Sequence, residues 1–274
     1  MGDVTPRIHV GTGGWTFPPW RNNFYPEKWP HARELEYASR QLTAIEINAT
    51  YHGAQKPASF ARWRDDTPDD FVFSVKASRF ATTRKLLAES KESIDRFIGS
   101  GISELGAKLG PIVWQFMPTK RFEPDDFEAF LSHLPNKVDG LPLRHVLDVR
   151  HTSFMTPAYL TLARRYHCAT VFADTDEHPS FADLTGGFVY ARLMRCESSL
   201  ASGYAPAALD TWAQRARTWA AGGEPTDLPR VETAPAPGPA RDVFMFFISG
   251  AKERAPAAAV ALLKRLPGLA GRSA

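Results

Sequence analysis

Short hydrophobic runs rich in β-branched and aromatic residues recur along this chain, and most are followed by a segment with helical periodicity. Several runs, such as residues 71–75 and 243–248, are almost continuously apolar, which is typical of parallel strands covered on both faces. The alternation of strand and helix patterns therefore predicts a parallel sheet. The eight predicted strands begin near Ile8, Ala44, Phe71, Pro111, His145, Ala169, Gly187 and Asp242.

Segments with helical patterns lie between these runs, and four of them open with a proline, which suits the first helical turn. Eight strands with at least seven helices predict an α/β fold of the (β/α)8 TIM-like barrel type. Residues 175–186 leave room for only a turn or a very short helix, so we expect an irregular barrel with one helix short or missing between strands 6 and 7. The predicted helices cover residues 32–42, 58–65, 89–105, 124–134, 157–166, 206–221 and 256–266.

A chain of 274 residues suits one barrel, and its 43% of hydrophobic residues supply enough apolar surface for a large core. Residues 224–241 are rich in proline and alanine, which favours an extended loop before the last strand. A linker between domains is the alternative, but the segment that follows is too short for an independent core. We therefore predict one domain over residues 1–274 with this loop inside it.

The formal net charge of +3 helps to attract an anion without amounting to a nucleic-acid footprint. The two cysteines, Cys168 and Cys196, lack metal-type spacing, so neither a disulfide framework nor a zinc site is predicted. The sequence contains no long apolar stretch, and residues 1–7 lack the apolar core of a signal peptide. We therefore expect a cytoplasmic protein without a membrane span.

The ends of the predicted strands carry most of the chain's candidate functional residues. In a closed α/β barrel the loops and the last strand residues converge there on one face. Nearly every strand ends in a side chain that ionises or makes fixed hydrogen bonds. These residues are Thr12, Trp15, Glu46, Asn48, Lys76, Gln115, Asp148, Arg150, His151, Asp174 and Arg192.

Each of these residues has a structural alternative. Glu46 lies between hydrophobic residues of a predicted strand, so its carboxylate needs a positively charged partner when it is ionised. Lys76 or Arg192 can be that partner. The pair is equally consistent with a structural ion pair and with a binding site. Lys76 suits anion binding or, with a lowered pKa, acid–base or Schiff-base chemistry. Arg150 and Arg192 suit two-point recognition of carboxylate or phosphate, with salt bridges at the barrel mouth as the alternative.

The remaining polar residues are less specific. His151 is a candidate general acid or base, and a hydrogen-bonded loop histidine is the alternative. Asp174 and Asp176, with Glu46 and Asp148, have the chemistry of a hard-cation site, but the lack of dense histidine and carboxylate spacing predicts no metal. The glycines of residues 11–14 lack the dinucleotide fingerprint, and no cofactor is assigned. The aromatic residues after them cover part of the barrel mouth or stack on a sugar or base.

These residues in this order resemble the domain-of-unknown-function family 72, also called YecE-like. The resemblance runs from about residue 8 to residue 266 and implies a TIM-barrel fold without an established activity. It implies pocket roles for Trp15, Glu46, Asn48, Tyr51, Lys76, Gln115, Arg150, His151 and Arg192. The matching segments are VGTGGWTFPPWRNNFYP, LEYASRQLTAIEINATYH, FVFSVKASRFATTRKL, KLGPIVWQF, LDVRHTSF, FVYARL and FISGAKERAPAAAVALL.

The sequence departs from this family pattern at three strand ends. Asp148 stands where the family usually has glutamate, and Met194 and Arg195 replace a histidine–glycine pair. Residues 248–250 differ from the asparagine-rich strand end of many members. These departures predict either a different mode of ligand binding or a lost reaction.

The leading hypothesis is an enzyme that acts on a small polar anion such as a phosphorylated sugar or nucleotide derivative. The alternatives are a nucleic-acid binding or processing protein, whose binding weakens steeply with salt, and a non-catalytic metabolite-binding scaffold. All three leave the substrate and the oligomeric state open. The predicted catalytic residues are Glu46, Lys76, Asp148 and His151, and the predicted ligand-binding residues are Trp15, Asn48, Tyr51, Gln115, Arg150, Asp174 and Arg192.

Overall fold

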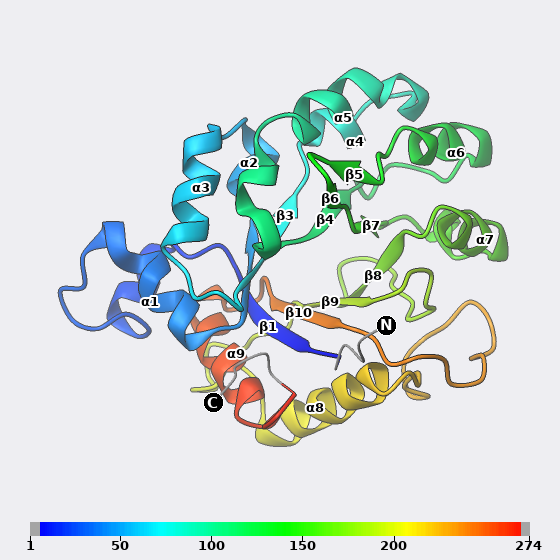
Figure 1. Cartoon of the computed structure of the whole chain (residues 1–274). Helices are drawn as coiled ribbons and strands as arrows, with labels where there is room; N and C mark the ends of the chain where they lie inside the picture. The colour runs from blue at the N-terminus through cyan, green and yellow to red at the C-terminus, as the bar shows by residue number, and fades with distance from the viewer. Residues whose placement is uncertain (1–5, 270–274) are drawn as a thin grey trace.

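A closed barrel of eight parallel strands forms the centre of the molecule (Figure 1). The computed structural model describes residues 6–269. The strands follow one another around the barrel in the order β1-β10-β9-β8-β7-β4-β3-β2, which confirms the predicted TIM-like fold. The barrel strands are β1 (Ile8–Gly13), β2 (Ala44–Ile47), β3 (Val72–Lys76), β4 (Leu109–Gln115), β7 (His145–Asp148), β8 (Ala169–Asp174), β9 (Val189–Leu193) and β10 (Val243–Phe247).

Helices surround the barrel, and several of them carry a proline in the first turn (Figure 1). The longer helices are α1 (Glu34–Gln41), α3 (Pro57–Asp65), α5 (Lys91–Ile98), α6 (Pro124–Ser132), α7 (Pro157–Arg165), α8 (Pro206–Ala220) and α9 (Ala255–Leu263). The short elements are α2 (Ala49–His52), α4 (Arg79–Thr82), η1 (Pro18–Asn22), η2 (His31–Arg33), η3 (Leu87–Ser90), η4 (Ile102–Lys108), η5 (Thr152–Phe154), η6 (Lys252–Arg254), and the antiparallel pair β5 (Lys137–Val138) and β6 (Leu141–Pro142).

The prediction of one continuous helix over residues 89–105 is wrong. The chain instead forms η3, α5 and η4 in succession, with a break at Gly101. Gly101 adopts a left-handed conformation with φ of 100°, which glycine reaches without strain. A Cβ atom there would lie 2.8 Å from Cα of Pro57, so the close approach of α3 also requires glycine.

The connection between β8 and β9 contains neither helix nor strand over residues 175–188, as the sequence predicts. Residues 224–241, which also lack regular structure, pack against it. The amide of Ala182 donates to Pro229 O at 2.8 Å, and Asp183 accepts from the amides of Val231 and Glu232 at 2.8 and 3.0 Å. The proline-rich loop thus packs on the connection that lacks a helix.

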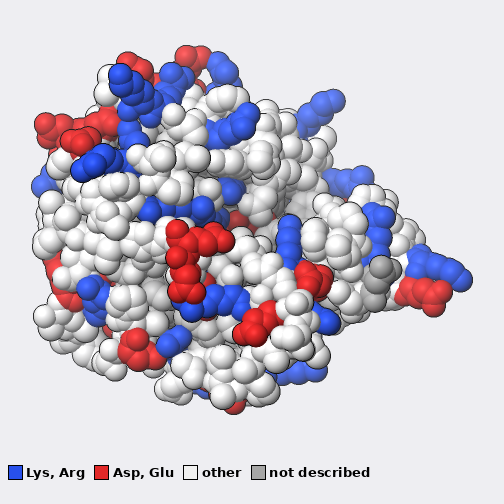
Figure 2. Space-filling view, turned by 180° about the vertical axis from the view of Figure 1, so that it is seen from behind, with Lys and Arg blue, Asp and Glu red and all other residues white. Residues whose placement is uncertain are grey.

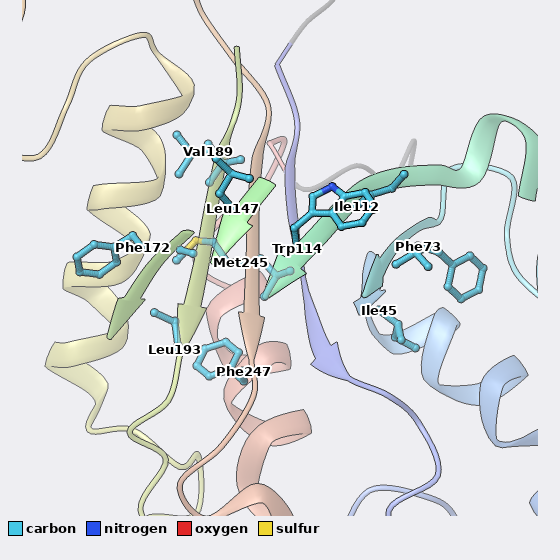
Figure 3. Close-up of a cluster of buried hydrophobic side chains, with 14 of the residues drawn as sticks. Ile45, Phe73, Ile112, Trp114, Leu147, Phe172, Val189, Leu193, Met245 and Phe247 are labelled. Carbon is cyan, nitrogen blue, oxygen red and sulfur yellow. The ribbon is translucent and has the colours of Figure 1, made fainter. Parts of the chain in front are cut away.

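Alternate residues of each strand point to opposite sides of the barrel wall. One set, including Phe73, Trp114 and Leu193, is buried between the strands and the helices (Figure 3). The other set fills the barrel interior and includes Ala44, Val113, Val146, Tyr190, Phe244 and Phe246. Because side chains alternate with a period of two, Glu46 and Arg192 continue this interior set at the carboxyl ends of their strands.

Candidate functional site

Arg192 joins three other strand ends at the carboxyl-terminal mouth of the barrel. Its Nε and Nη2 donate to Glu46 Oε2 at 3.1 and 2.8 Å. Its Nη1 donates to Asp148 Oδ2 at 2.6 Å and to Gln115 Oε1 at 3.1 Å. Arg192 is only 1% exposed and Glu46 is 0% exposed, so these charges are almost fully removed from water. Four strands therefore meet in one buried hydrogen-bond network.

The ionisation of Asp148 and Arg192 is fixed by their mutual contact. Burial opposes both charges, but Arg192 and Arg150 outweigh it at Asp148 and lower the pKa of that carboxyl. Glu46 and Asp148 likewise outweigh burial at Arg192 and raise the pKa of the guanidinium. Arg150 adds a second cation, with Nη2 2.8 Å from Asp148 Oδ2. Asp148 is therefore a carboxylate whose oxygens are committed to two arginines.

The two carboxylate oxygens of Glu46 differ in their surroundings. Oε2 accepts from Arg192 and also from the hydroxyl of Tyr190 at 2.6 Å. The Tyr190 hydroxyl lies 2.8 Å from Ser74 Oγ, which extends the network to β3. Oε1 is buried and accepts no hydrogen bond from any residue that the structure describes. Oε2 of Glu46 is thus saturated with hydrogen bonds, whereas Oε1 can still accept one from a ligand.

Lys76 ends β3 beside this network, and its ammonium has no anionic partner among the residues that the structure describes. Nζ lies 4.2 Å from the centroid of the Tyr51 ring. Within residues 6–269 no hydrogen bond or salt bridge joins Nζ to another side chain, Glu46 and Asp148 included. Burial and the charge of Arg192 lower the pKa of Lys76 to about 8, although Glu46 and Asp148 act in the opposite direction. Lys76 is therefore a cation at neutral pH and titrates near pH 8.

Two other predicted residues are engaged elsewhere. Nδ1 of His151 accepts from the amide of Ser153 at 3.1 Å and lies 2.8 Å from its hydroxyl, so the imidazole caps its own turn. Asp174 pairs with Arg195 at 3.0 Å and accepts from Tyr204 at 3.2 Å. Neither His151 nor Asp174 makes a hydrogen bond or salt bridge to the Arg192 network in the part of the chain that the structure describes.

Trp15 and Asn48 line a neighbouring groove of about 440 Å³ at the carboxyl ends of β1, β2 and β10. Trp15 packs edge-on against Trp63, with ring centroids 5.3 Å apart. Within the described chain, the side chain of Asn48 makes one hydrogen bond, from Nδ2 to the backbone carbonyl of Glu46 at 3.4 Å. The amide of Gly14 donates to the same carbonyl at 2.9 Å, which places the groove directly beside the network.

The sequence prediction overlooked three polar residues near the network. Tyr190 lies two residues before Arg192 and therefore on the same face of β9, so the alternation of the strand carried the signal. Ser74 stands in the same relation to Lys76. His178 helps to lower the pKa of Asp148, and its Nε2 is buried without a hydrogen-bond partner among the described residues. His178 comes from the irregular β8–β9 connection, where no periodic pattern in the sequence indicates the direction of a side chain.

The family model described as "Protein of unknown function DUF72" matches residues 9–272 of this sequence. The chain belongs to the DUF72 family. Its curated relatives include YecE of Escherichia coli K12, 28% identical over 142 residues that cover 50% of this chain and 48% of YecE. YunF of Bacillus subtilis is 26% identical over 157 residues, which cover 56% of this chain and 54% of YunF. The matches thus span about half the length of these relatives.

Solved structures of DUF72 proteins share the fold. A member from Thermotoga maritima superposes with a TM-score of 0.69 at 20% identity, over 95% of this chain and 98% of that one. A member from Enterococcus faecalis gives a TM-score of 0.66 at 13% identity, over 97% and 96% of the two chains. The family predicted from the sequence segments and its barrel are therefore both confirmed.

The three strand ends at which the sequence predicts departures from the family pattern have contacts of their own. Asp148 binds two arginines, and Arg195 pairs with Asp174 at 3.0 Å and with Asp176 at 2.7 Å. Gly250 forms a bridge to Cys196 and adopts a φ of 77°. These residues are thus integrated into the barrel mouth.

The residues that the structure describes contain no group of three His, Cys, Asp or Glu side chains arranged to hold a metal ion. Glu46 and Asp148 are held by opposite sides of the Arg192 guanidinium, and Asp174 belongs to the separate pair with Arg195. None of the helices within residues 6–269 is long and apolar enough to cross a membrane.

Proposed function

We propose that this barrel is an enzyme that acts on a small anionic compound, such as a phosphorylated sugar or nucleotide derivative, at the carboxyl ends of its strands. One juxtaposition carries the proposal: an ammonium without an anionic partner, on Lys76, stands beside a buried carboxylate with an unused oxygen, on Glu46. A barrel that only has to fold gains nothing from a partly buried ammonium without an anion or from a buried carboxylate oxygen without a donor, because unsatisfied buried polar groups are costly.

The anion contacts Lys76 and Arg150. Lys76 supplies a compact positive charge held against the ring of Tyr51. Arg150 uses Nε and Nη2 for Asp148, which leaves Nη1 to donate to a ligand. Arg192 keeps its role as the buried centre of the network, since Glu46, Asp148 and Gln115 already occupy its nitrogens. The anion is thus recognised by the two more accessible of the three predicted cations.

Glu46, and not Asp148, is the general base in this proposal. Both oxygens of Asp148 accept from arginines, which lower its pKa and make it a weak proton acceptor. Oε1 of Glu46 accepts no hydrogen bond from the described chain, and Tyr190 holds the carboxylate in place through Oε2. His151 is left to assist through Nε2, because its Nδ1 is bonded to Ser153.

A screen of ligand-induced thermal stabilisation tests the proposal, with orthophosphate, sugar monophosphates and nucleoside monophosphates as probes. Lys76→Met should abolish the stabilisation, whereas Lys91→Met, which removes a surface lysine paired with Asp95, should keep it. Glu46→Gln should still bind a stabilising compound but lose its turnover, followed by phosphorus NMR. An undiminished shift in Lys76→Met refutes the assignment.

A small ligand fits the charge distribution better than nucleic acid does. Figure 2 shows Lys and Arg interspersed with Asp and Glu on one face of the molecule, without a continuous basic surface on that face. Binding of nucleic acid depends on many phosphate contacts and weakens steeply with salt. A steep salt dependence with a single-stranded oligonucleotide, stronger than with a sugar phosphate, would favour the nucleic-acid alternative. Binding without turnover would favour the scaffold.

A further inference from the structure

A second lysine without an anionic partner among residues 6–269 stands three strands along the rim of the barrel mouth from Lys76. Nζ of Lys252, on η6, lies 4.7 Å from the centroid of the Phe17 ring and 5.9 Å from that of Trp20. The Lys252 carbonyl accepts from Trp20 Nε1 at 2.8 Å, which fixes the backbone below the side chain. Nζ itself makes no hydrogen bond or salt bridge with any residue in the described range 6–269. Lys252 therefore repeats the arrangement of Lys76 over Tyr51.

Lys252 lines the groove of about 440 Å³ together with Trp15, Phe17, Asn48 and His52. The groove runs along the ends of β10, β1 and β2, and Lys76 ends β3, the next strand around the barrel. Neighbouring strands are about 4.8 Å apart, so β10 and β3 are separated by roughly 14 Å along the wall and by less through space. Two unpaired ammonium groups thus stand at the two ends of one short arc of the rim, with aromatic side chains between them.

We infer that this groove is a second anion subsite, and that the ligand is a ring compound with an anionic group at each end, such as a sugar bisphosphate. This inference rests on the proposed function and adds to it the ligand's second charge. The inner network is balanced, because Glu46 and Asp148 face Arg192 and Arg150, so the two lysines carry the surplus positive charge. A ligand with one anionic group satisfies one lysine, and a ligand with two satisfies both.

The ring of the ligand lies against the aromatic wall. Trp15 is held edge-on by Trp63 at 5.3 Å, and Phe17 by Trp20 at 5.8 Å, so both walls are fixed before a ligand arrives. Asn48 supplies a hydrogen-bonding group for ring hydroxyls, since its only contact in the described chain is the long one to the backbone of Glu46. Fixed aromatic walls limit the ordering that binding requires.

The test compares fructose 6-phosphate with fructose 1,6-bisphosphate by titration calorimetry on the full chain. The bisphosphate should bind at least about tenfold more tightly, as expected for one added charge-assisted contact. Lys252→Met should remove this advantage by weakening the bisphosphate more than the monophosphate, whereas Lys76→Met should weaken both. Lys91→Met serves as the control for loss of one positive charge. Equal affinities in the parent, unaffected by Lys252→Met, overturn the second subsite and leave the proposed function standing.

A second measurement examines Lys252 without relying on either sugar. Pyridoxal 5′-phosphate, an aromatic aldehyde with one phosphate, forms an imine and water with a lysine amine, and borohydride then reduces the imine so that peptide mapping finds it. Faster labelling of Lys252 than of Lys91, slowed by orthophosphate, supports an anion subsite even where Lys76 binds nothing. Labelling of Lys252 that orthophosphate does not slow overturns it.

Discussion

The two ends of the barrel carry similar charged and aromatic groups but differ in how the charges are compensated. At the amino-terminal ends of the strands, Arg144 lies 5.0 Å from the centroid of the Phe244 ring and pairs with Asp242 at 3.3 Å. His9 stacks on the same ring with centroids 4.8 Å apart. Burial lowers the pKa of His9 to about 4, so this imidazole is neutral at pH 7. At this end Arg144 is paired with Asp242 and His9 is neutral, so these groups stabilise the barrel.

The carboxyl-terminal end is built in two layers. The network around Arg192 is internally balanced and nearly inaccessible to water. Lys76 and Lys252 stand above it, each over an aromatic ring and without an anionic partner among residues 6–269. In barrels of this type ligands bind at this end, whereas the opposite end serves stability. A cation that is paired with a carboxylate thus indicates a structural role, whereas a cation without such a partner indicates a binding site.

Removal of Arg192 gives the largest expected effect and tests the distinction within the mouth. Arg192→Met leaves Glu46 buried without its cation, which costs about 3–5 kcal/mol of unfolding free energy. Lys76→Met removes a partly buried cation that no carboxylate among residues 6–269 pairs, so we expect no loss of unfolding free energy and a small gain, because burial opposes the charge of the ammonium. Urea unfolding of both variants and the parent measures the difference. Similar losses of unfolding free energy in the two variants would show that Lys76 stabilises the fold as part of the Arg192 network.

The buried neutral imidazole of His9, at the amino-terminal ends of the strands, predicts a loss of stability in acid. His9 has a pKa of about 4 in the folded protein and an ordinary value of 6.5 in the unfolded chain, so the unfolded chain binds more protons between these values. The stabilisation is therefore complete above pH 6.5, decreases progressively as the pH falls from 6.5 to 4, and is absent below pH 4. Between pH 7 and pH 5 the unfolding free energy should decrease by about 2 kcal/mol from this group.

Replacement of His9 by phenylalanine, which keeps the stack on Phe244, isolates this contribution. His145 also has a pKa lowered to about 4 by burial, and its Nδ1 accepts from Trp114 at 3.0 Å, so part of the acid loss remains in the variant. Urea unfolding at pH 7 and pH 5 should show a smaller decrease in His9→Phe than in the parent. An equal decrease would mean that His9 accepts a proton in the folded barrel without cost.

The barrel and the centre of its site were predictable because both follow from the alternation of side chains along strands. Hydrophobic runs located the strands, and the strand-end rule brought Glu46, Gln115, Asp148 and Arg192 to one face. The same alternation contained Tyr190, which only a reading of the whole strand, and not of its last residue, would have found. The residues that form a network at the strand ends can thus be predicted from the alternation of side chains in the sequence.

The parts that the sequence did not predict depend on loops and on close approaches in space. The break at Gly101 arises where α3 approaches the chain, and no local pattern encodes that contact. His178 comes from an irregular connection whose path is set by hydrogen bonds to residues 224–241. His151 faces its own turn because Ser153 lies two residues later, a capping interaction that competes with a role in the pocket.

Titration of Lys76 gives the smallest effect and sharpens the contrast between the two ends of the barrel. Lys76 loses its charge at high pH and should then lose anion binding, whereas His9 gains a charge at low pH and should then lower stability. Anion binding requires the ammonium, and a pKa of about 8 means that its population falls tenfold per pH unit above that value. Sulfate keeps its charge over this range, so its affinity should stay constant from pH 6.5 to 7.5 and fall about tenfold between pH 8.5 and 9.5. Lys76→Arg keeps a positive charge at these pH values and should bind sulfate with a flat profile. An equal fall in Lys76→Arg assigns the titration to another group, and a flat profile in the parent shows that the Lys76 ammonium does not ionise in this range.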